Sequence, residues 1–366
     1  MKQINFENVN LLNSRVNLLS GNLLPIAIDN SRFSIIWRIY SVIVWLIELI
    51  HTIALIFGII LVPKEKALKD GTVGSVVILE TSFMLLWLYS HKKLMKQIIQ
   101  KMNDIFQNTD EIMKGIVKSA LKPITMPFVI YGVTAFSTEP FSSQVLISST
   151  ILMTIGSVYL FLKKFGVDIY MIHLVLMLTV QYRYTAAKLT ILCQDQNFQN
   201  KSPNKYSMKN RWIKKELREL CRHQNTVLNI SFMLKKLLSI NFSLLYINNV
   251  FRFCFIGILL STVPSSTFAE GISIILFTLG SLTQFFLLCS SVQTLSDAST
   301  EMTDKAFNEG WYQFGSSNKR TFISLIMANN LECKIAAIGK FNLSLPSFMT
   351  IMNQSYSIAL LFLRAK

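Results

Sequence analysis

The feature that most constrains this chain is a series of apolar stretches, each about as long as a membrane is thick. Roughly 20 mostly apolar residues, folded as a helix, cross the ~30 Å hydrocarbon layer of a bilayer. The stretches that meet this requirement are residues 41–62, 73–89, 237–263, 268–292 and 345–363. Since 51% of the residues are hydrophobic and only 15% are charged, the sequence predicts an all-α protein that spans a membrane.

The region between the second and the later stretches allows two interpretations. Residues 124–136 are apolar, but 13 residues make a helix of only about 20 Å, and a polar turn follows at 137–140. Residues 145–180 are then apolar except for Lys163, Lys164 and Asp168. They form either one long tilted helix that protrudes from the membrane, or two short spans at 145–162 and 165–180 if 124–136 does not cross. Both versions give the same parity of spans.

The basic residues alternate between the loops. Residues 1–38, 92–122, 183–222 and 305–340 together hold 26 Lys and Arg, whereas residues 63–72, 123–162, 253–304 and 364–366 together hold five. By the positive-inside rule the first set is cytoplasmic, so we expect the amino terminus inside, the carboxyl terminus outside and an odd number of spans. Seven is the simplest number. The orientation excludes a G-protein-coupled receptor and accounts for the net charge of +16 without nucleic acid.

The sequence offers little for enzyme chemistry. Its five cysteines and four histidines form no metal-ligand or disulfide pattern, and no nucleophile with a base and no phosphate-binding loop is present. We therefore expect no enzyme activity, no metal and no cofactor.

The predicted organisation has five parts. They are membrane helices one to four (1–182), a cytoplasmic helical extension (183–236), membrane helices five and six (237–292), a cytoplasmic anchor segment (293–340) and a last helix (341–366). The extension and residues 319–337 both show apolar residues at helical spacing, including Phe322, Leu325 and Ile326, which predicts packing against a neighbour.

Ionisable residues inside the spans are costly, so each one is a candidate functional residue. Glu48 and His51 share one face of the first span, Glu80 lies in the second, and Arg252 lies in the fifth. We expect these groups to pair between helices, and Asp168 to be paired. Lys163 and Lys164 are expected to reach the outer surface with their long side chains.

Three segments near the carboxyl end resemble the signature of the insect odorant receptor family. They are AFNEGW at 306–311, KRTFISLIMANNLEC at 319–333 and LSLPSFMTIMNQSYSIALL at 343–361. The resemblance extends to Gln181-Tyr182-Arg183 and to the uninterrupted 268–292 helix, so it covers essentially the whole chain. The chain departs from the family pattern after residue 136, where about 30 residues of the third span and the following outer loop look absent.

The resemblance implies a ligand-gated, non-selective cation channel that forms a heterotetramer with an obligate odorant co-receptor. It also implies a place in the plasma membrane, on the dendrite of an olfactory sensory neuron. In such proteins residues 319–337 match an anchor helix between subunits, and residues 345–363 match the helix that lines the pore. A gustatory receptor channel and, less favoured, a secondary transporter remain as alternatives.

Two sets of candidate site residues follow. For a small volatile or lipophilic ligand, spans two to five supply an apolar pocket with a few hydroxyls: Thr81, Met84, Tyr131, Thr134, Tyr159 and Phe255. For the pore and gate, the last helix supplies Met352, Gln354, Ser355, Ala359 and Leu363. On spacing alone this second set fits ordinary helix packing as well as a dewetting constriction, and the resemblance favours the pore.

Overall fold

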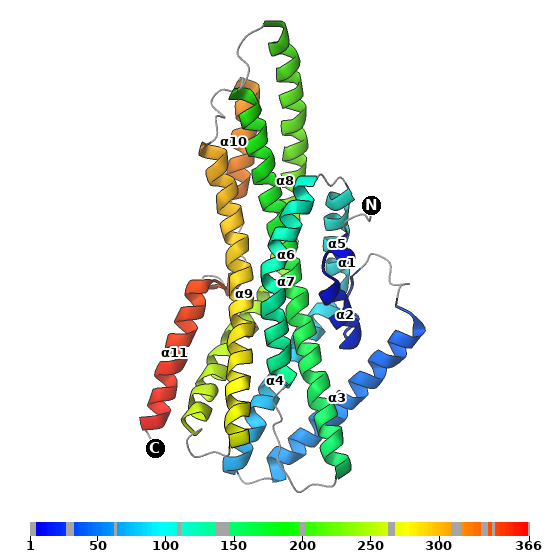
Figure 1. The fold of residues 1–366 in the computed structure, drawn as a ribbon, viewed down its shortest axis with the longest axis vertical. Coiled ribbons are helices and arrows are strands. Elements are labelled where there is room, and N and C mark those ends of the chain that lie inside the picture. The colour runs from blue at the N-terminus through cyan, green and yellow to red at the C-terminus, as the bar shows by residue number, and fades with distance from the viewer. Residues whose placement is uncertain are drawn as a thin grey trace.

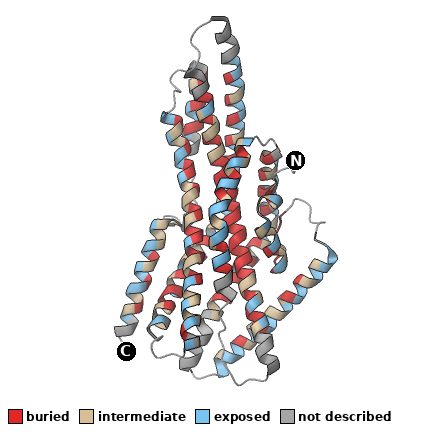
Figure 2. Ribbon diagram, viewed as in Figure 1, coloured by how far each residue is buried: buried red, intermediate tan, exposed pale blue. Residues whose placement is uncertain are grey.

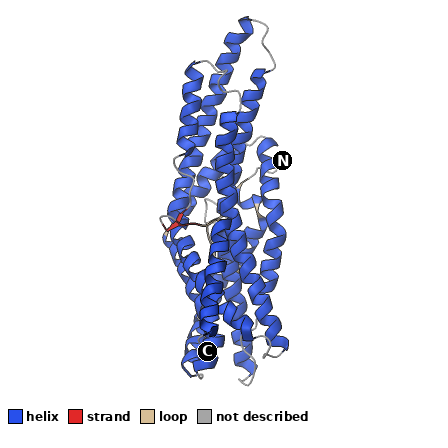
Figure 3. Ribbon diagram, turned by 90° about the vertical axis from the view of Figure 1, so that its left-hand side faces the viewer, coloured by secondary structure: helices blue, strands red, loops and turns tan. Residues whose placement is uncertain are grey.

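The computed structural model describes residues 5–26, 33–61, 64–107, 111–136, 147–197, 203–262, 268–308, 316–330, 336–338 and 341–364. Nearly all of this part is helical, as predicted. The helices are α1 (Phe6–Val9), α2 (Leu11–Leu19), α3 (Ile35–Leu61), α4 (Lys64–Ser90), α5 (Lys92–Gln107), α6 (Glu111–Phe136), α7 (Ile147–Asn197), α8 (Pro203–Thr262), α9 (Phe268–Asn308), α10 (Ser316–Asn330) and α11 (Leu345–Arg364). Two short strands, β1 (Ala336–Ile338) and β2 (Phe341–Asn342), pair antiparallel and form the small hairpin in Figure 3.

The helices form an elongated bundle with α7 at its centre (Figure 1). Every residue of α7 from Lys163 to Tyr182 is buried, and Figure 2 shows this continuous buried stretch in the middle of the molecule. A helix that is buried on all sides is the core of a helical protein. The two chain ends lie apart, the carboxyl end at the lower tip of the bundle and the amino end in its upper half (Figure 1).

The structure decides between the two interpretations of residues 145–180. Helix α7 is one continuous helix of 51 residues, so the single long helix is confirmed and the hairpin of two short spans is wrong. Lys163, Lys164 and Asp168 do not interrupt it because their side chains find partners on neighbouring helices, as described below.

Helix α6 is twice as long as the apolar run that predicted it. Its 26 residues correspond to about 39 Å at 1.5 Å per residue, so residues 124–136 are the second half of a longer helix rather than a separate short one. Hydropathy concealed the first half, where Lys114, Lys118 and Lys122 recur every four residues. Pro123 and Pro127 lie inside the helix.

The predicted spans 237–263 and 268–292 are parts of much longer helices. Helix α8 has 60 residues and α9 has 41, so the expected continuation of the helices beyond the apolar stretches is confirmed. Both rise together at the upper end of the bundle, where α10 packs against them (Figure 1).

The amphipathic segment at 319–337 is only partly helical. Helix α10 ends at Asn330, and Ala336 and Ala337 belong to strand β1, so a single helix up to residue 337 is wrong. Phe322, Leu325 and Ile326 are buried in a helix that packs on α8 and α9 of the same chain. The apolar stripe is therefore covered within the chain rather than only between subunits.

The amino-terminal segment is an integral part of the bundle. Helix α2 packs on α7, and the turn after it has Gly21 at φ +68° with Ser41 Cα only 3.3 Å from where a Cβ would lie. Four helical side chains then hold the backbone of residues 19–25: Tyr40 and Ser41 of α3, Tyr89 of α4 and Tyr170 of α7.

Among the described residues, three helical segments are long and apolar enough to cross a membrane: Ile35–Leu61, Arg211–Leu260 and Gly271–Asn308, with Gly74–Ser90 as a shorter apolar helix. Helix α7 is not in this set, and its middle carries the three charged residues Lys163, Lys164 and Asp168. It can carry them because it is surrounded by protein rather than by lipid.

Candidate functional site: a buried charge network beside a small cavity

Four ionisable side chains from three helices meet in the bundle core. Lys164 of α7 lies between two carboxylates, 2.5 Å from Glu80 Oε1 of α4 and 2.8 Å from Asp168 Oδ1. Arg252 of α8 donates to the other oxygen of Glu80. All four residues are at most 5% exposed, so the expected pairing of Glu80, Arg252 and Asp168 is confirmed.

Neutral side chains complete this network. Gln284 of α9 accepts from Arg252 Nη1 at 2.7 Å and donates to Asp168 Oδ2 at 2.7 Å. Tyr131 of α6 donates to the same Asp168 oxygen at 3.0 Å, and Asn248 of α8 donates to Glu80. The network thus joins α4, α6, α7, α8 and α9, and two carboxylates offset two cations.

A second buried ion pair lies on the α3 side of α7. Lys163 Nζ is 2.6 Å from Glu48 Oε2 and 3.3 Å from the ring centroid of Trp45, which adds a cation–π contact. His51 lies 3.3 Å from the Ser157 hydroxyl. Pairing of Glu48 is therefore confirmed.

The expectation that Lys163 and Lys164 reach the outer surface is wrong. They are 0% and 2% exposed, because Glu48 and Glu80 on neighbouring helices supply counter-charges within the core. A buried ion pair of good geometry offsets much of the desolvation cost that would otherwise drive a lysine to the surface.

A cavity of about 30 Å³ adjoins the charge network. It is lined by Val77, Tyr131, Phe161, Lys164, Arg252, Phe277, Gly280, Ser281 and Gln284. The lining therefore combines charged and polar side chains with apolar and aromatic ones.

The residues predicted to bind a ligand lie in different places. Tyr131 lines the cavity, and Met84 is buried with its sulfur 3.9 Å from Lys164 Nζ. Thr81 is buried beside Glu80 on α4. Tyr159 is half-buried near Tyr40 of α3, Phe255 is half-buried on α8, and the side chain of Thr134 lies outside the described part.

The sequence reasoning missed several cavity residues. Gln284 had a signal, since it is an amide in an otherwise apolar span, and buried amides in a membrane usually make interhelical hydrogen bonds. Phe161, Phe277 and Gly280 had none, because aromatic and small residues are common on any face of a spanning helix.

Helix α11 has one face packed on α8 and one face free. Ser355 donates to the Val250 carbonyl at 3.2 Å, and Ala359 lies close to Gly257, where an added Cβ would be 2.8 Å from the Ala359 Cβ. Met352 is half-buried, and Gln354 is exposed. Leu363 is in the helix, with its side chain outside the described part. Of the predicted pore residues, Ser355 and Ala359 thus face α8 in the single chain.

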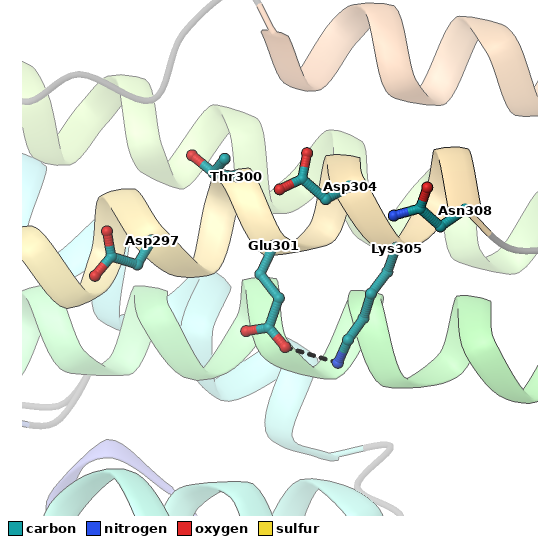
Figure 4. Close-up of a pocket in the computed structure, with 6 residues that line it drawn as sticks. All are labelled: Asp297, Thr300, Glu301, Asp304, Lys305 and Asn308. Atoms are coloured by element: carbon teal, nitrogen blue, oxygen red, sulfur yellow. Dashed lines mark ion pairs between the residues drawn. The ribbon is translucent and has the colours of Figure 1, made fainter.

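A larger hollow lies on the surface of α9, beyond its apolar stretch. It has a volume of about 530 Å³ and is lined by Asp297, Thr300, Glu301, Asp304, Lys305 and Asn308. Figure 4 shows these side chains projecting from a single helix, with Glu301 and Lys305 paired at 2.6 Å. It is an open, solvated helix face, distant in sequence from all the candidate ligand residues.

The continuous helical bundle, its apolar spans and its charged core define a multi-spanning helical membrane protein. Residues 113–356 match the family model of the 7tm odorant receptor. This match covers two thirds of the chain, so the protein belongs to the odorant receptor family, as the carboxyl-terminal segments had indicated.

Individual relatives agree with this assignment. Odorant receptor 67c of Drosophila melanogaster is 28% identical over 138 residues, which are 38% of this chain and 31% of that protein. The chain therefore matches about a third of the length of this curated relative. The insect olfactory receptor OR5 from Machilis hrabei, in complex with eugenol, has the same fold, with a TM-score of 0.77 at 12% identity over 99% of this chain and 100% of that chain. A second structure of that receptor gives the same TM-score over 97% of each chain.

Proposed function

We propose that the protein is the odorant-sensing subunit of a ligand-gated, non-selective cation channel that assembles with a co-receptor in the plasma membrane of olfactory neurons. Small volatile or lipophilic molecules open it. Membership of the odorant receptor family supports this function, and one observation on the structure carries it further.

That observation is the free face of α11. Thr350, Asn353, Gln354, Tyr356 and Ser357 are exposed, while the opposite side of the helix packs on α8. Polar side chains facing lipid are costly, so this face is suited to water or to another subunit. Copies of α11 around a common axis would make a polar ion path from these residues.

This geometry refines the pore set. Gln354 belongs to the free face, and Met352 lies at its border. Ser355 and Ala359 instead hold α11 against α8, where they would act on gating rather than contact permeating ions.

The test is to record currents from cells that express this chain with and without the co-receptor, while a panel of volatile compounds is applied. Cation current that needs both chains supports the proposal. Gln354→Glu should change the permeability ratios between cations, whereas Gln100→Glu, the same change at an exposed position of the cytoplasmic helix α5, should not. Uptake of a substrate without current would contradict a channel and favour a transporter.

A further inference from the structure

A cluster of basic side chains lies where helices α3 and α5 begin. Arg38 is in the first turn of α3, and Lys92 and Lys96 stand one turn apart on the same side of α5. Partial burial lowers the pKa of Lys92, and the like charges of Lys96 and Arg38 lower it further. The three cations therefore lie close enough to repel one another, although two different helices supply them.

No ion pair with a carboxylate of the described residues neutralises this basic cluster. The ion pairs in that part of the chain involve other cations. Glu48, the acidic residue of α3, is paired with Lys163, and Asp104, the acidic residue of α5, lies about two turns beyond Lys96. Because neighbouring like charges without a counter-charge repel each other, the cluster is suited to an anion from outside the chain.

Aromatic side chains indicate that the basic cluster lies at the level of the lipid headgroups. Trp37 and Tyr40 of α3 meet edge to face, with ring centroids 5.7 Å apart, and Trp87 packs on His91 at the end of α4. Trp and Tyr are enriched at the interface between membrane and water. With the amino terminus inside, as the basic loops predict, this is the interface of the inner leaflet, which carries anionic lipids.

An apolar surface for acyl chains continues from the basic cluster into the membrane. Val42 lies one turn after Arg38 on the same side of α3 and is followed by Leu46, and both side chains are exposed. The start of α3 slants away from the bundle (Figure 1), so this side of the helix is open to lipid. A headgroup bound at the cluster would therefore leave its acyl chains along α3.

We propose that Arg38, Lys92 and Lys96 bind the headgroup of an inositol phospholipid of the inner leaflet that carries phosphomonoester groups. These three cations and the exposed Lys93 beside them outnumber the single net charge of phosphatidylserine, whereas a headgroup with several phosphates neutralises them. The guanidinium of Arg38 also matches phosphate, because it can donate two parallel N–H groups. The inference goes beyond the proposed channel function and needs only the predicted orientation of α3.

The experiment measures the thermal midpoint of the full, detergent-purified receptor while one of three probes is added. The probes are dioctanoyl phosphatidylinositol bisphosphate, dioctanoyl phosphatidylserine and inositol trisphosphate, which has no acyl chains. The bisphosphate lipid should stabilise the receptor at a concentration about 10- to 100-fold lower than phosphatidylserine, because its headgroup attracts all of the basic residues. Inositol trisphosphate should need a concentration at least about 10-fold higher than the bisphosphate lipid, because it makes no apolar contact with α3.

Neutral variants test the residues. Arg38→Gln, Lys92→Gln and Lys96→Gln together should raise the half-stabilising concentration of the bisphosphate lipid about 10- to 100-fold. Lys92→Arg with Lys96→Arg should leave it near the wild-type value, because both charges remain. Arg38→Gln alone changes an exposed side chain and should raise the concentration about fivefold, so the test holds even if the triple variant does not fold.

The matched control removes the same number of charges far along the chain. It combines Lys214→Gln, Lys215→Gln and Arg218→Gln, three exposed positions in the N-terminal half of α8, and its response to the bisphosphate lipid should equal that of the wild type.

Four results would overturn the proposal. They are equal stabilisation by phosphatidylserine, equal stabilisation by inositol trisphosphate, an unchanged response of the folded cluster variants, and an equal loss in the control variant. Equal stabilisation by inositol trisphosphate would assign the cluster to a soluble phosphate instead of a lipid. Since the assay measures binding to the purified receptor and records no current, its outcome is independent of whether the protein is a channel.

Discussion

The charge balance of the core leads to a strong prediction about Glu80 and Lys164. Glu80→Gln leaves Lys164 and Arg252 with only Asp168 as a counter-charge, and Lys164→Met leaves one carboxylate in excess. Breaking a buried pair by removing one partner costs about 3–5 kcal/mol, because an uncompensated charge stays in the core. The double variant restores neutrality, so its loss of stability should be smaller than the sum of the two single losses.

The size of the effect in a melting experiment follows from the length of the chain. At roughly 2.1 cal/mol/K of unfolding entropy per residue, a loss of 3–5 kcal/mol in a chain of 366 residues lowers the thermal midpoint by about 4–6 °C. The assay is thermal denaturation of the detergent-purified receptor for the wild type, both single variants and the double variant. If each single variant shifts the midpoint by less than about 1 °C, or if the two shifts simply add, the four groups do not act as one network and the argument from neutrality fails.

Three further outcomes are expected. On intact cells that are not permeabilised, an epitope tag at the carboxyl terminus should be labelled and a tag at the amino terminus should not. The reverse result would refute the orientation inferred from the basic loops. Gly257→Ala should destabilise the fold by about 1–3 kcal/mol, because the new methyl group meets Ala359. Gly58→Ala is the control and should be harmless, because its methyl group meets nothing within 4 Å. If the two variants have equal thermal midpoints, α8 and α11 are not in close contact. Burial lowers the pKa of His223, in the N-terminal half of α8, to about 4. The free energy of unfolding should therefore fall by up to roughly 3 kcal/mol as the pH decreases from about 6.5 to 4, because the buried imidazole must then take up a proton. His223→Gln should flatten this part of the profile of stability against pH.

Hydropathy predicted the spanning helices well where they face lipid. Helix α9 begins at Phe268 and α11 at Leu345, the same residues at which the apolar stretches begin. The lipid-facing residues of α3, such as Ile39, Leu46 and Phe57, are exposed in the chain itself, and a membrane must cover them. Because lipid favours apolar side chains, helices that face lipid can be recognised from the hydropathy of the sequence.

The same signal failed where helices are surrounded by protein. Helix α7 was ambiguous because Lys163, Lys164 and Asp168 look like interruptions in a single sequence, although each has its counter-charge on a neighbouring helix or one turn away. Pairing across helices depends on tertiary structure, and one sequence without an alignment contains no record of it. The ionisable residues could be predicted to pair, but not which residue each one would contact.

Local backbone geometry also escaped sequence reasoning at both ends of the chain. The amino-terminal segment folds inward because Asn17 both donates to the Leu24 carbonyl and accepts from the Leu24 amide, at 2.9 Å each. Asparagine side chains close such turns frequently, yet nothing in the pattern shows that the turn will dock on α7. The strand at Ala336–Ile338 follows a helical pattern that simply stops earlier than the apolar spacing suggests.

The position of the charge network on α8 links the cavity beside it to the helix proposed to line the pore. Arg252, which lines the cavity, lies two residues from Val250 and five from Gly257, and these two residues hold Ser355 and Ala359 of α11. Seven residues of helix span about 10 Å, so a movement of Arg252 acts on a rigid element that also contacts α11. The glycine variant Gly257→Ala distinguishes coupling between the two sites from a change in stability alone. If α8 transmits the ligand signal, Gly257→Ala should shift the ligand concentration for half-maximal current without changing how strongly the ligand stabilises the purified receptor, because the cavity is untouched and only the contact with α11 is altered.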